Sequence, residues 1–83
     1  MTTYTPEQIA QAVADNAKTG KWLSQTFHIQ QGENLAAVGV KAFGRWVQRV
    51  ELCGMVDGVP EQKTLKALKA QTADLISRML ASC

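Results

Sequence analysis

The segment GVKAFGRWVQRVELCGMVDG, residues 39 to 58, lies in the part of the chain with the strongest periodic pattern. Apolar residues recur there at three- and four-residue intervals, as on one face of an α-helix; they are Leu35, Val38, Ala42, Phe43, Trp46, Val47 and Val50. Gly39 and Gly44 interrupt the pattern, so Gly39 could instead mark a helix boundary. We predict a helix over residues 39–52 that ends at Cys53-Gly54 and places Phe43, Trp46, Val47 and Val50 in the core. Whether residues 35–52 form one continuous helix stays open.

Two further helices are predicted on either side of this segment. Thr5-Pro6-Glu7-Gln8 is typical of a helix start, with a capping threonine, a proline at the first position and a glutamine that completes a capping box. This first helix is expected over residues 6–19. The last helix is expected to open at Pro60 and run over residues 60–81, with a buried face of Leu65, Leu68, Thr72, Leu75, Ile76, Met79 and Leu80.

Residues 21–29, KWLSQTFHI, fit either a helix or a strand. We favour a short helix there, followed by a turn over residues 30–34 with Asn34 as a helix cap, and we expect another turn at Asp57-Gly58. The predicted fold is therefore all-α, a single domain over residues 1–83 with three to four helices. An 83-residue chain has room for one core, and its stability would be only a few kcal/mol, so a partner could contribute to it.

Composition restricts the function only loosely. The formal net charge of +2 is too small to indicate nucleic acid by itself. The N-terminus has no apolar signal pattern and no apolar run is long enough to span a membrane, which predicts a cytoplasmic protein without a membrane partner. Cys53 and Cys83 are then expected to be reduced thiols.

The sequence offers little material for catalysis. His28 is the single histidine, and its place beside Phe27 is typical of a surface or half-buried packing residue. Two cysteines and one histidine cannot form a four-ligand zinc site, and the glycines do not form a phosphate-binding loop. We predict no enzyme, no catalytic residues, no metal and no cofactor.

Residues 21–29 and 39–58 together resemble DNA-binding winged-helix domains, among them the small one at the end of bacterial chromosome translocases. The resemblance is carried by Phe27-His28-Ile29, by the glycine-led segment at 39, and by the exit Leu52-Cys53-Gly54-Met55-Val56. It implies a helix-turn-helix in which residues 39–52 are the recognition helix. The chain continues almost at once into the last helix, so the β wing of such a domain would be vestigial.

A recognition helix must bury one face and present polar side chains on the other. Such side chains lie opposite the apolar face of the predicted helix; they are Lys41, Arg45, Gln48 and Arg49. Lys18 and Lys21 could add contacts to the DNA backbone. The predicted function is a small duplex-DNA-binding regulator of transcription or replication.

The alternative is a helical protein-interaction module, an inhibitor or adaptor. It would bind an acidic protein surface through the same cations or through Lys63, Lys66 and Lys69. A homodimer through the C-terminal helix is left open under either function. Ordinary solvent-exposed helices also carry such cations, so the charged face alone does not decide between the two.

Overall fold

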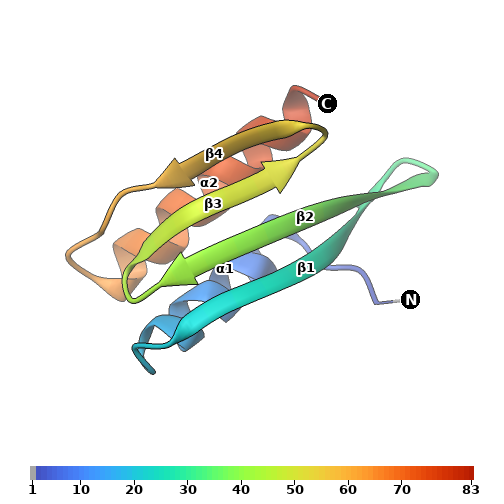
Figure 1. Ribbon diagram of the computed structural model, residues 1–83. Helices are drawn as coiled ribbons and strands as arrows, with labels where there is room; N and C mark the ends of the chain where they lie inside the picture. The colour runs from blue at the N-terminus through green and yellow to red at the C-terminus, as the bar shows by residue number, and fades with distance from the viewer. Residues whose placement is uncertain (1) are drawn as a thin grey trace.

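The protein has an α+β fold in the computed structural model, which describes residues 2–83. One helix precedes and one follows four consecutive strands (Figure 1). The elements are α1 (Pro6–Ala17), β1 (Trp22–Gln31), β2 (Asn34–Phe43), β3 (Trp46–Leu52), β4 (Met55–Val59) and α2 (Leu65–Ala81). The all-α prediction is therefore wrong, and with it the helix-turn-helix and its wing.

The strands form one antiparallel sheet in the order β1-β2-β3-β4, so each strand pairs with its neighbour in the sequence. Two residues connect each consecutive pair of strands. Such short turns need left-handed backbone, and in the β3–β4 turn both Cys53 and Gly54 have positive φ, 52° and 76°, as a type I′ turn requires. In the β2–β3 turn only the first of the two residues, Gly44, has positive φ, 58°.

Both helices pack on one face of the sheet (Figure 1). They contact each other, and α1 lies against β1 and β2 while α2 lies against β3 and β4. The core fills the space between helices and sheet; its members include Ile9, Val13, Phe27, Ile29, Val38, Val40, Ala42, Val47, Val50, Leu52, Leu68, Leu75 and Ile76. The opposite face of the sheet is covered by no element of the described chain.

The start of α1 is as predicted. Thr5 Oγ1 accepts a hydrogen bond from the Gln8 backbone N–H at 3.2 Å, and Gln8 Oε1 accepts one from the Thr5 N–H at 2.9 Å. Because these bonds satisfy donors that the first helical turn leaves unpaired, they fix where the helix begins. The helix ends at Ala17, two residues before the predicted end.

The last helix begins later than predicted. Thr64, not Pro60, marks its start, since the Thr64 hydroxyl accepts a hydrogen bond from the Ala67 N–H at 3.1 Å. The predicted inner face is confirmed in its central part: Leu68, Thr72, Leu75, Ile76 and Met79 are buried. Leu65 and Leu80, at the two ends of the predicted stripe, are only partly buried against the core.

The predicted helix over residues 39–52 is instead the end of β2, a turn and β3, and the short helix predicted at 21–29 is β1. Asn34 begins β2 rather than capping a helix, and Asp57-Gly58 lies within β4. Val47 and Val50 are buried as predicted, but Phe43 and Trp46 are exposed. In an extended strand successive side chains alternate between faces, so residues that share one side of a helix are divided between two sides of the sheet.

A β-bulge interrupts the pairing of β3. Val47 pairs with Val59 and Val50 with Asp57, so two residues of β3 lie opposite Gly58 alone. A Cβ atom on Gly58 would lie 2.8 Å from the Val47 carbonyl oxygen, a distance at which the backbone would have to move. Only glycine fits at this point of β4.

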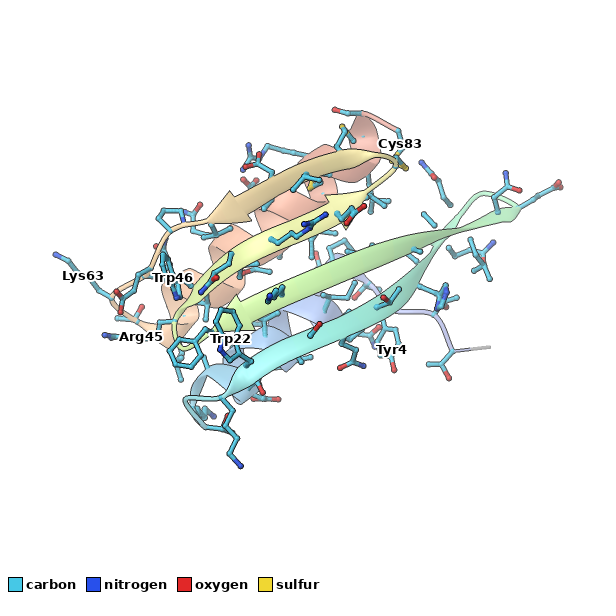
Figure 2. All side chains as sticks on the ribbon, viewed as in Figure 1. Tyr4, Trp22, Arg45, Trp46, Lys63 and Cys83 are labelled. Atoms are coloured by element: carbon cyan, nitrogen blue, oxygen red, sulfur yellow. A yellow bond between two sulfur atoms is a disulfide. The ribbon has the colours of Figure 1, made fainter. Side chains whose placement is uncertain are left out.

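Cys53 and Cys83 form a disulfide, which contradicts the predicted reduced thiols. Their Cα atoms lie 5.8 Å apart. The bond ties the C-terminal end of the chain, just beyond α2, to the β3–β4 turn, as Figure 2 shows beside the label of Cys83. It therefore joins the helical layer to the sheet at one end of the molecule.

Candidate functional site

One face of the sheet points away from the helices (Figure 1) and is called here the open face. Its side chains lie in rows that run across the strands. It is built from alternate residues of each strand: Trp22, Ser24, Thr26, His28 and Gln30 of β1; Leu35, Ala37, Gly39, Lys41 and Phe43 of β2; Trp46, Arg49 and Glu51 of β3; and Val56 of β4. Antiparallel sheets often leave one face to solvent, but that face is then usually polar. Here it carries large apolar side chains.

An aromatic row lies at the end of the open face next to the β2–β3 turn. Phe43 pairs with Trp22 on one side and with Trp46 on the other. The three residues remain 39%, 53% and 44% exposed, respectively. The rings of Trp22 and Phe43 pack at a centroid distance of 5.0 Å, and Figure 2 shows Trp22 and Trp46 at the same end of the sheet. Three exposed aromatic side chains in adjacent positions form an apolar patch of a kind that marks binding surfaces.

A basic row follows, two residues further along the strands. Lys41 pairs with Ser24 of β1 and with Arg49 of β3. The Lys41 ammonium lies 5.1 Å from the centroid of the Trp22 ring, a cation–π contact that links this row to the aromatic one. Arg49 forms an ion pair with Glu51 at 2.9 Å.

The third row contains a hollow. Gly39 lies between Thr26 of β1 and Glu51 of β3, and it has no side chain to fill the space. A cavity of about 260 Å³ opens there, lined by Ser24, Thr26, Gly39, Lys41, Arg49 and Glu51 among others. A second hollow shares Thr26, Gly39 and Glu51 and continues past Ala37 toward the β3–β4 turn. The two hollows form a shallow trough that follows β2, between the side chains of β1 and those of β3.

The predicted DNA-binding residues are only partly brought together. Lys41 and Arg49 lie side by side on the open face, and Gln48 is the exposed extra residue at the bulge. Arg45 is in the β2–β3 turn, where its guanidinium donates to the Lys63 carbonyl at 2.6 Å and pairs with Glu61 at 3.5 Å. None of these four residues lies on a helix, so the predicted recognition helix for the DNA major groove is absent.

Lys18 and Lys21 lie in the connection between α1 and β1. Lys18 faces Asp15 at 4.0 Å, and the Lys21 carbonyl accepts a hydrogen bond from the Asn16 side chain at 3.0 Å. Lys21 directly precedes Trp22 and therefore lies at the aromatic end of the sheet. His28 is half-buried, as its position beside Phe27 predicted.

The described residues contain no group of three or more metal-ligating side chains. Their one buried polar side chain, Thr72, donates its hydroxyl to the Leu68 carbonyl at 2.7 Å. Over residues 2–83, no helix has the length and apolar character needed to cross a bilayer. The open face, with its exposed aromatic row and its hollow, is the strongest candidate for a functional surface.

Comparison of the chain with protein families, with characterised proteins and with solved structures finds no match in any of the three. Sequence reasoning missed the aromatic row because it assigned Phe43 and Trp46 to the core. The available signal was the hairpin chemistry: Gly44 and Cys53-Gly54 each separate runs rich in valine and aromatic residues.

Proposed function

We propose that this protein is an interaction module that binds another protein, as an adaptor or inhibitor, through the open face of its sheet. The observation that carries the proposal is the aromatic row, Trp22, Phe43 and Trp46, exposed on a sheet face that the described chain leaves uncovered. Tryptophan and arginine are the residue types most enriched where protein interfaces gain their binding energy. Both types lie at this end of the sheet.

The charges near the aromatic row favour a partner with acidic groups. Lys41 lies next to the row, and Lys21 and Lys63 lie at the same end of the molecule. Like charge on a partner would be repelled, whereas carboxylates at the rim of the contact would be attracted. An acidic protein surface therefore remains the proposed partner, bound by a sheet rather than by a helix.

Duplex DNA is no longer proposed, because the recognition helix on which it depended is absent. Single-stranded nucleic acid, which stacks on exposed aromatics beside a track of cations, has weaker support. Arg45 and Arg49 are each paired with a glutamate, and the Trp22 ring already contacts Phe43 and the Lys41 ammonium. Lys21 and Lys63, unpaired within residues 2–83, lie outside the strands, so they add no track of cations along the sheet for phosphates, and the Trp22 ring has little free face for a base.

A homodimer through α2 is not proposed either. The apolar stripe of α2 is used within the chain, where Leu68, Leu75 and Ile76 pack in the core. Its outward side carries Lys66 and Lys69. In a symmetric dimer through α2 these lysines would face the same lysines of the second copy, and the like charges would repel.

The disulfide is informative about the cellular compartment in which the protein functions. Disulfides persist in oxidising compartments, whereas the cytosol keeps most thiols reduced. The Cys53–Cys83 bond therefore favours an oxidising compartment over the predicted cytoplasm. Trapping thiols with an alkylating reagent during extraction and measuring the mass of the protein decides the matter: two modified cysteines would favour the cytoplasm, and none would favour the oxidising compartment.

The binding proposal is tested by selecting a displayed library of random peptides on the immobilised protein. Trp22 and Trp46 are the two tryptophans of the chain, so their fluorescence reports directly on the open face. We expect the selected peptides to change this fluorescence and to bind the Trp46→Ser variant at least about 30-fold more weakly, the loss typical of a central interface tryptophan. A Lys66→Ser, Lys69→Ser variant, altered on the far side of the molecule, serves as the matched control and should bind normally.

Two results would contradict the proposal. One is the failure of selection to enrich any peptide, or enrichment of peptides that bind wild type and Trp46→Ser equally. The other is tight binding of a single-stranded oligonucleotide that changes the tryptophan fluorescence and weakens steeply as salt is added, which would assign the face to nucleic acid.

A further inference from the structure

The rows of the open face are spaced like the side chains of an extended peptide. The aromatic, basic and hollow rows follow one another at two-residue steps: Phe43, Lys41 and Gly39 are their members on β2. A strand rises about 3.3 Å per residue, so neighbouring rows lie about 7 Å apart. Side chains two positions apart in an extended peptide have the same separation and point to the same side. A peptide laid along β2 would therefore meet one row with each alternate side chain.

The trough along β2 has the shape for such a peptide. Its floor is formed by small residues, Ala37 and Gly39, and its walls by side chains of β1 and β3. At Gly39 the walls offer the hydroxyls of Ser24 and Thr26, and the ammonium of Lys41 and the guanidinium of Arg49 lie at the lining of the same hollow. These groups can all donate hydrogen bonds, and a carboxylate accepts only.

We infer that the partner segment is extended and carries an apolar side chain followed, two positions away, by an aspartate or glutamate. The apolar side chain packs on the aromatic row, and the carboxylate meets the next row, the basic one, where Lys41 and Arg49 line the near end of the hollow over Gly39. This inference rests on the proposed function and adds to it the chemistry and spacing of the partner.

Glu51 controls access to this hollow. In the free protein its carboxylate holds the Arg49 guanidinium at 2.9 Å, and both side chains are about half exposed. To bind Arg49, an incoming carboxylate must take the place of the Glu51 carboxylate. The negative charge of Glu51 repels the incoming carboxylate during this exchange. The pair is exposed, so its loss has little effect on stability. Removing the Glu51 charge should therefore strengthen the binding of an acidic peptide, the reverse of what a mutation in a binding surface usually does.

Gly39 supplies a second, opposite perturbation. A Cβ atom built on it meets only Glu51, at 3.8 Å from the Glu51 Cβ and 4.0 Å from its carbonyl oxygen, and its φ is one that other residues adopt. Valine also suits a strand. Gly39→Val thus fills the hollow while the fold and the aromatic row stay as they are.

The test repeats the peptide selection with wild type, Gly39→Val and Glu51→Gln as baits. Peptides selected on wild type are expected to carry Asp or Glu two positions from an aromatic or aliphatic residue. Replacing that acid by its amide in a synthetic peptide should weaken binding at least about 10-fold, as expected for a hydrogen bond to a charged group. Glu51→Gln should strengthen binding of the acidic peptide about 2- to 5-fold and leave the amide peptide unchanged. Gly39→Val should bind both peptides equally weakly.

Circular dichroism of each variant shows whether it is folded. If Gly39→Val is not, then Gly39→Ala, which fills the hollow in part, and Lys41→Gln, which removes a charge without filling it, take its place with the same expected loss of acid preference. Peptides that need the aromatic row but show no acid at the second position would overturn this inference and leave the proposed function intact. A selection that enriches no peptide at all would overturn both.

Discussion

Removing the Cys53–Cys83 disulfide should lower the free energy of unfolding by about 3.6 kcal/mol. The two cysteines are 30 residues apart in the sequence. In the chain-entropy model, opening a closed loop of this size gives the unfolded chain conformational freedom worth about that amount at 25 °C. A chain of this length typically has roughly 4 to 12 kcal/mol of stability in total. The bond therefore accounts for a large share of it, and its loss corresponds to a fall of about 15 to 25 °C in Tm.

The measurement is urea denaturation followed by far-ultraviolet circular dichroism, on wild type with and without reductant and on a Cys53→Ser, Cys83→Ser variant. Serine is the appropriate replacement at both positions. Glycine at position 53 would relax the positive φ of that residue and add an effect of its own. Reductant should destabilise wild type to the level of the double variant and should not change the double variant.

A loss of less than about 1 kcal/mol, in protein whose mass shows that the bond was formed, would refute this reasoning. It would mean that the unfolded chain gains little freedom when the bond opens, because residual structure already holds the two ends together. A loss well above the calculated value would show instead that the bond also maintains native contacts between the end of α2 and the β3–β4 turn.

Three further predictions concern single positions of the fold, each measured by the same urea denaturation. Gly58→Ala should destabilise the protein by about 1 to 3 kcal/mol, because its Cβ would lie 2.8 Å from the Val47 carbonyl oxygen; an unchanged midpoint would show that the bulge adjusts freely. Phe27→Ala should cost about 3 to 5 kcal/mol and Phe27→Leu much less, since Phe27 is 2% exposed and packs edge-on against Tyr4; similar losses for both would argue against cavity formation as the cause. Thr5→Ala should lower the free energy of unfolding by about 1 kcal/mol, because the α1 capping box is lost, whereas Thr5→Ser should keep most of the stability that the cap provides. Equal losses for both variants would show that the cap is not the cause.

The ends of the fold could be predicted from the sequence because their signals are local. The Thr5-Pro6-Glu7-Gln8 cap places the start of α1 correctly, and the apolar stripe centred on Thr72 gives the inner face of α2. Both depend on contacts within one or two helical turns. Such local signals do not depend on how the rest of the chain folds.

The middle of the chain could not be read in this way, since a tight hairpin imitates helical spacing. Across a two-residue turn the first cross-strand pair, Phe43 and Trp46, is separated by three positions. The inner pair behind it, Ala42 and Val47, is separated by five. Together with Val50, shifted by the bulge, these residues reproduce the intervals of an amphipathic helix although they lie on opposite faces of the sheet.

The candidate site was affected by the same confusion. Lys41 and Arg49 were placed on one helix face about two turns apart. They are instead direct neighbours, as a cross-strand pair on a sheet. The aromatic row was assigned to the core because large apolar residues usually belong there. Recognising it required the register of three strands, which brings Trp22 beside Phe43 although the two are 21 positions apart in the chain.

The packing of α1 against α2 has a consequence for the order in which the protein folds. Each strand pairs with its sequence neighbour across a two-residue turn, so the three hairpins can form from local contacts. The two helices, by contrast, flank the entire sheet in sequence and meet only when the chain between them has been brought into a compact form. Closing so long a loop is entropically the costliest step, so helix docking is expected to come last and to set the folding rate. Until the helices dock, paired strands expose apolar residues on both faces of the sheet, so changes that delay docking are expected to favour aggregation.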